Sequence, residues 1–190
     1  WQAGEAGLWC IDPIDGTSNF VAGIPYFAIS IAWLKNGRRE LGVVYDPAAN
    51  ECFYAARGQG AFLDGEPLPI RTPVSELRRA MAGIEPKRLS KDLIARMVAD
   101  PPYASLRNFG ASALDWCYTA AGRFDIYVHG KQKFWDYAAG SLILEEAGGK
   151  LSCLEGPFDA GEVWERSVIA SASPALFDQW QAWLASQASG

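Results

Sequence analysis

The chain has 190 residues, 49% of them hydrophobic, so we expect one globular domain spanning 1–190 and not a disordered segment. A formal net charge of −5 argues against nonspecific nucleic-acid binding. The sequence has no apolar run long enough to cross a bilayer, which argues against a membrane protein. Its four scattered cysteines contain no Cys-x-x-Cys pair, which argues against a zinc site and is typical of a cytoplasmic protein.

The first informative stretch is Trp9-Cys-Ile-Asp-Pro-Ile-Asp-Gly-Thr-Ser-Asn-Phe20. The apolar run from Leu8 to Ile11 predicts the end of a short buried strand. Residues three apart in a straight strand point to opposite faces, so the chain must turn if the carboxylates of Asp12 and Asp15 are to meet. Two carboxylates beside free backbone N–H groups suit Mg²⁺ and a phosphate. An ordinary Asp-Pro turn is the alternative interpretation.

A series of short β-prone segments separated by turn residues follows this stretch. We expect strands over residues 26–34, 41–45, 51–56 and 61–63, with turns at Asn36-Gly37, Asp46-Pro47 and Asp64-Gly65. This pattern is typical of an antiparallel meander, which would occupy about residues 1–70. Asp46 and Asp64 are interpreted as turn residues without a catalytic role.

The remainder, about 71–190, alternates between helical and strand patterns and predicts an α/β part. We expect helices over residues 90–99, 110–122, 134–147 and from Ser173-Pro174 to about Gln187, and strands over residues 106–109, 124–129, 151–154 and 168–172. Asp136 is expected at the N-cap of its helix, where its second oxygen stays available to a metal. Small residues at Gly110, Ala111 and Ser112 leave N–H groups open to a ligand, with close helix packing as the alternative.

Two motifs together resemble the inositol monophosphatase family of Mg²⁺-dependent, lithium-sensitive phosphatases. They are Asp12-Pro-Ile-Asp-Gly-Thr17 and Trp135-Asp-Tyr-Ala-Ala-Gly140, the second followed by Glu146-Ala-Gly-Gly149. The resemblance implies a layered αβαβα sandwich, as in fructose-1,6-bisphosphatases, and a homodimer. It also implies that this chain lacks the family's N-terminal helices and their metal-binding glutamate. Glu5 is interpreted as a loop residue and not as its replacement, so we expect weak metal binding and low activity from this chain alone.

The resemblance also implies roles for individual residues. The carboxylates of Asp12, Asp15 and Asp136 and the carbonyl of Ile14 would bind Mg²⁺, and Asp15 and Thr17 would be catalytic, with Thr17 Oγ orienting the attacking water. The expected substrate contacts are Gly16, Thr17, Gly110, Ala111, Ser112, His129 and Asp136. His129 stands where inositol phosphatases often have a glutamate, which weakens the case for inositol and leaves a purely structural role open.

The implied activity is Mg²⁺-dependent hydrolysis of inositol monophosphate, or of a similar small polyol or sugar phosphate, by a metal-activated water. Other substrates within the superfamily remain open: fructose 1,6-bisphosphate, histidinol phosphate and 3′-phosphoadenosine 5′-phosphate. A noncatalytic binding protein that keeps the fold is the third alternative.

Overall fold

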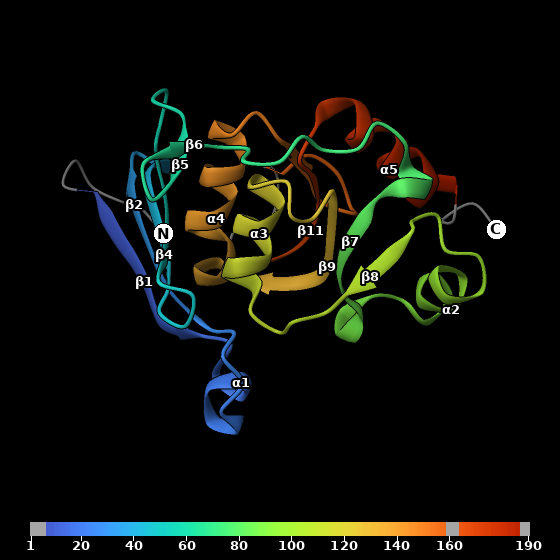
Figure 1. Cartoon of the computed structure of the whole chain (residues 1–190), viewed down its shortest axis with the longest axis horizontal. Helices are drawn as coiled ribbons and strands as arrows, with labels where there is room; N and C mark the ends of the chain where they lie inside the picture. Colours follow the sequence, from blue (N-terminus) through green and yellow to red (C-terminus); the bar gives the residue numbers. More distant parts are fainter. Residues whose placement is uncertain (1–6, 159–163, 187–190) are drawn as a thin grey trace.

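The computed structural model describes residues 7–158 and 164–186 (Figure 1). Within these residues, two β-sheets enclose one pair of helices, and further helices cover the far side of the second sheet. These layers match the α/β architecture expected from the sequence, in the order sheet, helices, sheet, helices.

The first sheet is the predicted meander. Its six strands are antiparallel and follow chain order: β1 Leu8–Asp15, β2 Ala28–Lys35, β3 Arg38–Asp46, β4 Glu51–Ala56, β5 Ala61–Leu63 and β6 Glu66–Pro67. The backbone of Asn36-Gly37 and of Asp64-Gly65 has positive φ, as expected for tight hairpin turns. Asp46 and Asp64 accept backbone hydrogen bonds in or beside turns, as expected for turn residues.

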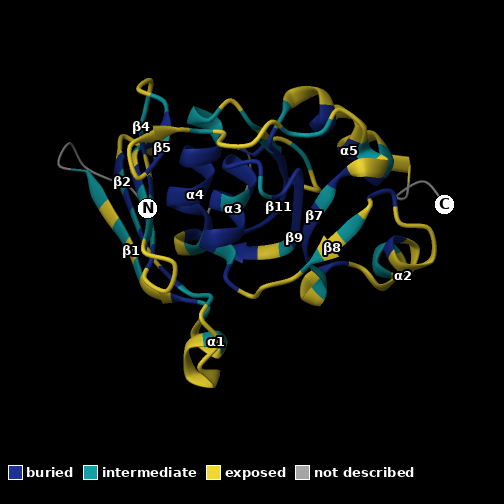
Figure 2. Ribbon diagram, viewed as in Figure 1, coloured by how far each residue is buried: buried dark blue, intermediate teal, exposed yellow. Residues whose placement is uncertain are grey.

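The two faces of this sheet differ in exposure (Figure 2). Its inner face, which includes Ala32, Val44 and Phe53, packs on the central helices α3 (Ser112–Ala120) and α4 (Phe134–Glu146). Its outer face leaves Trp9 and Ile11 more than half exposed. An αβαβα sandwich would pack its first helical layer on this outer face.

The second sheet has the strand order β10-β11-β9-β7-β8. Its strands are β7 Met81–Glu85, β8 Ser105–Arg107, β9 Ile126–Lys133, β10 Lys150–Ser152 and β11 Glu165–Ser171. β7 is parallel to both β8 and β9, whereas β11 is antiparallel to its neighbours. β7 was not predicted, because its short sequence contains alanine and glycine and no alternating pattern.

Helices α2 (Lys91–Ala99) and α5 (Pro174–Ser186) lie against the far side of the second sheet. Both begin where predicted, since Ser90 Oγ and Ser173 Oγ each accept a hydrogen bond from a backbone N–H three residues later. The predicted end of α5 near Gln187 lies outside the described residues. Among the described helices, none combines the length and the apolarity that a membrane crossing requires.

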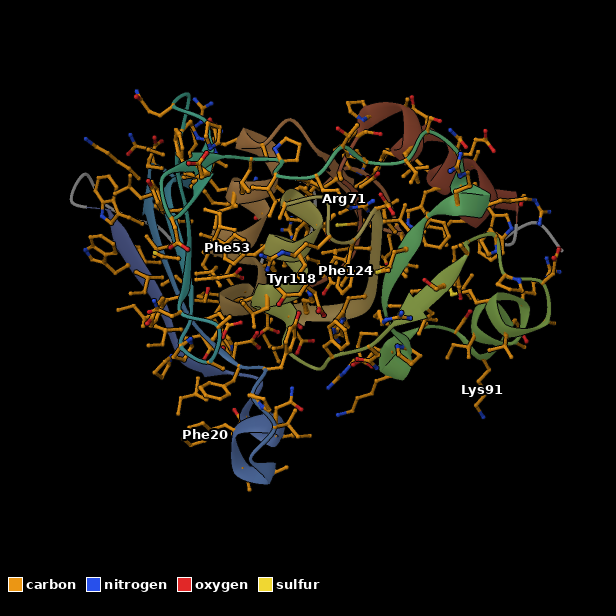
Figure 3. The ribbon with its side chains drawn as sticks, in the orientation of Figure 1. Phe20, Phe53, Arg71, Lys91, Tyr118 and Phe124 are labelled. Atoms are coloured by element: carbon orange, nitrogen blue, oxygen red, sulfur yellow. The ribbon has the colours of Figure 1, made fainter. Side chains whose placement is uncertain are left out.

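Asp125, whose side chain is almost fully buried, binds the segment that connects the first sheet to the second. Its Oδ1 accepts hydrogen bonds from the Arg71 guanidinium at 2.8 Å and from the Val74 N–H at 3.1 Å. Its Oδ2 accepts one from the Met81 N–H at 2.8 Å. Arg71 (labelled in Figure 3) also donates to the carbonyl of Gly122. One carboxylate thus holds the connecting segment against the start of β9.

We predict that Asp125→Ala lowers the free energy of unfolding by about 3–5 kcal/mol, because several hydrogen-bond donors would lose their acceptor inside the protein. Asp178→Ala is the matched control, since Asp178 pairs with Lys150 at 2.6 Å on an exposed surface. Its expected cost is below about 1 kcal/mol. Urea denaturation of the two variants measures both values, and equal losses would contradict the proposed role of Asp125.

Candidate metal centre

Asp12 and Asp15 lie together at the end of β1, but not through the turn expected from the sequence. The strand continues through both residues, pairing Asp12 with Ser30 and Asp15 with Ala28 on β2. Three steps along β1 therefore match two steps along β2, which is a β-bulge. Because residues two apart on β2 share a face, the bulge turns both carboxylates toward the same side of the sheet.

Asp136 comes from the start of α4, where the structure corrects the predicted position. Lys133 is the N-cap, and Asp136 is the third residue of the helix. The Asp136 carboxylate reaches back, and its Oδ2 accepts a hydrogen bond from the Lys133 N–H at 2.9 Å. This is one half of a capping box, since a lysine side chain cannot accept the return hydrogen bond, and it fixes the Asp136 side chain at the start of the helix.

The three carboxylates form one cluster. One oxygen from each of Asp12, Asp15 and Asp136 lies within 4.8 Å of the others. In addition, each carboxylate accepts a hydrogen bond from a backbone N–H: Asp12 from Ile14 at 3.1 Å, Asp15 from Ala113 at 2.7 Å, and Asp136 from Lys133. The second oxygen of Asp12 and of Asp136 is thereby left for another partner, whereas Asp15 is also held by the Gly16 N–H.

The electrostatics of the cluster favour a cation. Burial, followed by the nearby charges of Asp136 and Asp12, raises the pKa of Asp15 to about 7. Burial and the charge of Asp12 raise the pKa of Asp136 to about 6, and burial raises that of Asp12. Ligands that are all oxygen, with mutual repulsion among the carboxylates, suit a hard divalent cation such as Mg²⁺. The residues present therefore fit the metal that the sequence predicted.

The residues that follow Asp15 form a short helix, α1 (Thr17–Ala22), that was not predicted. Gly16 precedes it with φ of 81°, a conformation that favours glycine. The Thr17 hydroxyl donates a hydrogen bond to the Ile14 carbonyl at 3.0 Å. The carbonyl oxygen retains a second lone pair, so the predicted role of Ile14 as a metal ligand stays compatible with this geometry.

The segment Gly110, Ala111 and Ser112 lies beside the first motif, as its predicted role requires. The next residue, Ala113, donates its N–H to Asp15, so the start of α3 binds this carboxylate. Asn19 lies just after the first motif, and the sequence indicated no role for it. Its Nδ2 donates to the carbonyl of Phe109 at 2.6 Å and to that of Tyr26 at 2.8 Å. Asn19 therefore ties the two segments together.

His129 was expected at the end of the strand over residues 124–129; the strand β9 continues past it to Lys133, and His129 is largely buried. Its Nδ1 accepts a hydrogen bond from the Lys131 N–H at 3.0 Å. Burial, together with the charges of Arg88 and Lys87, lowers the pKa of His129 to about 4, so the ring is neutral at physiological pH. Its contact with a substrate stays a prediction. Glu5 lies outside the described residues.

Comparisons with known proteins agree with this site. The model of the inositol monophosphatase family matches residues 2–189. The chain belongs to the inositol monophosphatase family. It is 41% identical over 174 residues to Nus factor SuhB of Haemophilus influenzae, covering 87% of this chain and 62% of that protein. It is also 41% identical over 149 residues to the fructose-1,6-bisphosphatase/inositol-1-monophosphatase of Thermotoga maritima, covering 78% of this chain and 57% of that protein.

Solved structures of the family share the fold. SaIMPase-II with inositol monophosphate bound superposes with a TM-score of 0.84 at 30% sequence identity, covering 96% of this chain and 72% of that one. The chain spans only about three fifths of the length of the two relatives from Haemophilus and Thermotoga. The family model matches residues 2–189 of this chain, a range that includes all three residues of the carboxylate cluster.

We predict that the metal-free protein loses stability as the pH rises from about 4 to about 8. The raised pKa values of Asp15 and Asp136 mean that the folded chain holds protons that the unfolded chain has released, so their contribution falls through this window. Mg²⁺ needs deprotonated carboxylates, so it should raise the melting temperature more at pH 8 than at pH 5.

Thermal melts with and without Mg²⁺ test this. Asp15→Asn should be more stable than the unmodified protein at pH 8 without metal, and its response to Mg²⁺ should be smaller. Asp64→Asn changes a turn carboxylate outside the cluster and serves as the control. An equal Mg²⁺ response at both pH values would contradict the assignment.

Proposed function

We propose that this protein is a Mg²⁺-dependent phosphomonoesterase that hydrolyses inositol monophosphate or a similar small polyol or sugar phosphate. The observation that carries the proposal is the cluster of Asp12, Asp15 and Asp136 in a chain of the inositol monophosphatase family. These carboxylates, with the Ile14 carbonyl, would hold the cation. Bound Mg²⁺ would supply positive charge for the phosphate and acidify a water molecule.

Thr17 has the geometry to orient that water. Its hydroxyl has one proton, which it donates to the Ile14 carbonyl. The oxygen of the hydroxyl is therefore restricted to accepting a hydrogen bond, and a water O–H is a suitable donor. A water held in this way presents its lone pair in a defined direction, which lowers the entropic part of the barrier.

Some of the proposed substrate contacts are adjacent in sequence to residues that form or bind the cluster: Gly16 follows Asp15, and Ser112 precedes Ala113. One oxygen of Asp15 accepts a hydrogen bond from the Ala113 N–H, so the start of α3 is fixed relative to this carboxylate. We infer that Gly16, Thr17 and the segment Gly110–Ser112 contact the phosphate and the attached alcohol. A covalent phosphoenzyme is not expected, because the aspartates are committed to the cation.

The names of the relatives support two alternatives. The Thermotoga maritima relative is named a fructose-1,6-bisphosphatase as well as an inositol-1-monophosphatase, which keeps a sugar bisphosphate open as the substrate. Several other relatives are named Nus factor SuhB, which favours an additional role as a binding partner in transcription. The intact carboxylate cluster favours the enzyme, since a binding role alone has no evident need for it.

The test is phosphate release by the full-length protein, with and without Mg²⁺, from inositol 1-phosphate, fructose 1,6-bisphosphate, histidinol phosphate and 3′-phosphoadenosine 5′-phosphate. We expect Mg²⁺-dependent release from at least one compound. Asp136→Asn should lower kcat/KM by about 100-fold or more, because it removes a charged ligand, whereas Asp64→Asn should retain activity. No release from any compound would favour the binding role.

A further inference from the structure

The first motif and the entry to α3 pack against each other around Gly16. A Cβ atom on Gly16 would lie 3.0 Å from the Cβ of Ala111 and 3.1 Å from the carbonyl oxygen of Tyr26. Both distances are shorter than an ordinary van der Waals contact, so the segments meet with no space for a side chain between them. Asp15 directly precedes Gly16, and any shift between the two segments would therefore displace its carboxylate.

Tyr26, which lies between α1 and β2, joins the two segments through its side chain. Its hydroxyl donates a hydrogen bond at 3.1 Å to Oδ1 of Asp115, a buried residue of α3. The Tyr26 ring also packs on the rings of Phe109 and Tyr118, with centroid distances of 4.9 Å and 5.5 Å. Tyr118, on α3, is labelled in Figure 3. Because these rings hold the phenol in place, the hydroxyl is directed at Asp115.

The part of α3 that carries Asp115 also binds the candidate metal centre. Ala113, two residues before Asp115, donates its N–H to Oδ2 of Asp15 at 2.7 Å. The Asp115 N–H donates to the Ala111 carbonyl at 3.1 Å, so both residues belong to one hydrogen-bonded turn. A helical turn moves as a unit. The contact between Tyr26 and Asp115 therefore fixes the N–H that holds Asp15.

We propose that Tyr26 and Asp115 are positioning residues for the candidate metal centre. Their hydrogen bond keeps the first turn of α3 at the distance from the first motif where the Ala113 N–H meets Asp15. It thereby sets the direction in which the Asp15 carboxylate faces a cation, as outer hydrogen-bond partners do in metal sites. The inference rests on the proposed function and assigns two further residues to its metal site, which act through α3 and not by contact with the cation.

Calorimetric titration of Mg²⁺ into the full-length protein tests this role without turnover. Tyr26→Phe keeps the ring but removes the donor to Asp115, so the Kd for Mg²⁺ should rise about fivefold or more. Asn19 still fastens the same two segments, and the variant should therefore fold. Asp115→Asn retains an oxygen that accepts from Tyr26, so its Kd should stay within about twofold of the unmodified protein.

Tyr103→Phe is the matched control. Tyr103 is a buried tyrosine whose hydroxyl donates to the Met97 carbonyl at 3.2 Å, in the core under α2 and α5. Loss of this bond should lower the melting temperature but leave the Kd for Mg²⁺ unchanged. A purely structural role of Tyr26 predicts the same result for Tyr26→Phe, so an unchanged Kd in that variant would overturn the positioning role.

A second variant covers the case in which Tyr26→Phe does not fold. Tyr26→Phe/Asp115→Leu replaces both polar partners by apolar groups, which avoids leaving a buried carboxyl without its donor. It should show the same rise in Kd for Mg²⁺, of about fivefold or more. A Kd equal to that of the unmodified protein would again contradict the inference.

Phosphate release from inositol 1-phosphate separates this inference from the phosphatase function. If the unmodified protein is active, Tyr26→Phe should lose activity at low Mg²⁺ and regain most of its kcat at saturating Mg²⁺. Weaker Mg²⁺ binding by Tyr26→Phe, with no phosphate release by either protein, would support the positioning role and contradict the phosphatase function for this compound. Failure of the unmodified protein to bind Mg²⁺ would overturn both.

Discussion

The candidate metal site depends on one kind of interaction: each of its three carboxylates accepts a hydrogen bond from a backbone N–H. Asp15 accepts from Ala113 at 2.7 Å, and this bond joins the end of β1 to the start of α3. Asp136 accepts from the start of its own helix at 2.9 Å. Backbone donors move only with their strands and helices, so they hold the three carboxylates together in fixed orientations. The cost is repulsion among buried charges, which raises the pKa values of Asp15 and Asp136.

The layered fold makes this convergence possible. α4 is buried along most of its length, and such a helix must be covered on several sides. The first sheet covers it on one side, and α3 and the second sheet cover the others. The carboxylates of β1 and α4 meet where the first sheet borders the central helices. In the second sheet, β9 and the 3₁₀ turn η2 (Pro86–Arg88) place His129 near Lys87 and Arg88.

Local signals in the sequence were sufficient for the meander, for its hairpin turns and for the starts of α2 and α5. Turn geometry and helix capping depend on a few adjacent residues, so they can be predicted from short stretches. The structure brings the carboxylates of Asp12, Asp15 and Asp136 together, while their role as metal ligands stays a prediction and two details of their placement were wrong. The bulge between Asp12 and Asp15 depends on pairing with β2, and the N-cap of α4 depends on where β9 ends. Both are decided by a neighbouring element and not by the local pattern.

The sequence by itself determined the family, the oxygen-only character of the candidate metal site and the order of most strands and helices, because these depend on residue type and spacing. Only the tertiary structure decided which distant residues meet. Asn19 bonds to Phe109 across 90 residues, and β7 pairs in parallel with a strand that begins some 40 residues later. The position of His129 near Lys87 and Arg88 belongs to the same class. Such contacts arise from the packing of whole layers, for which a single sequence carries no local signal.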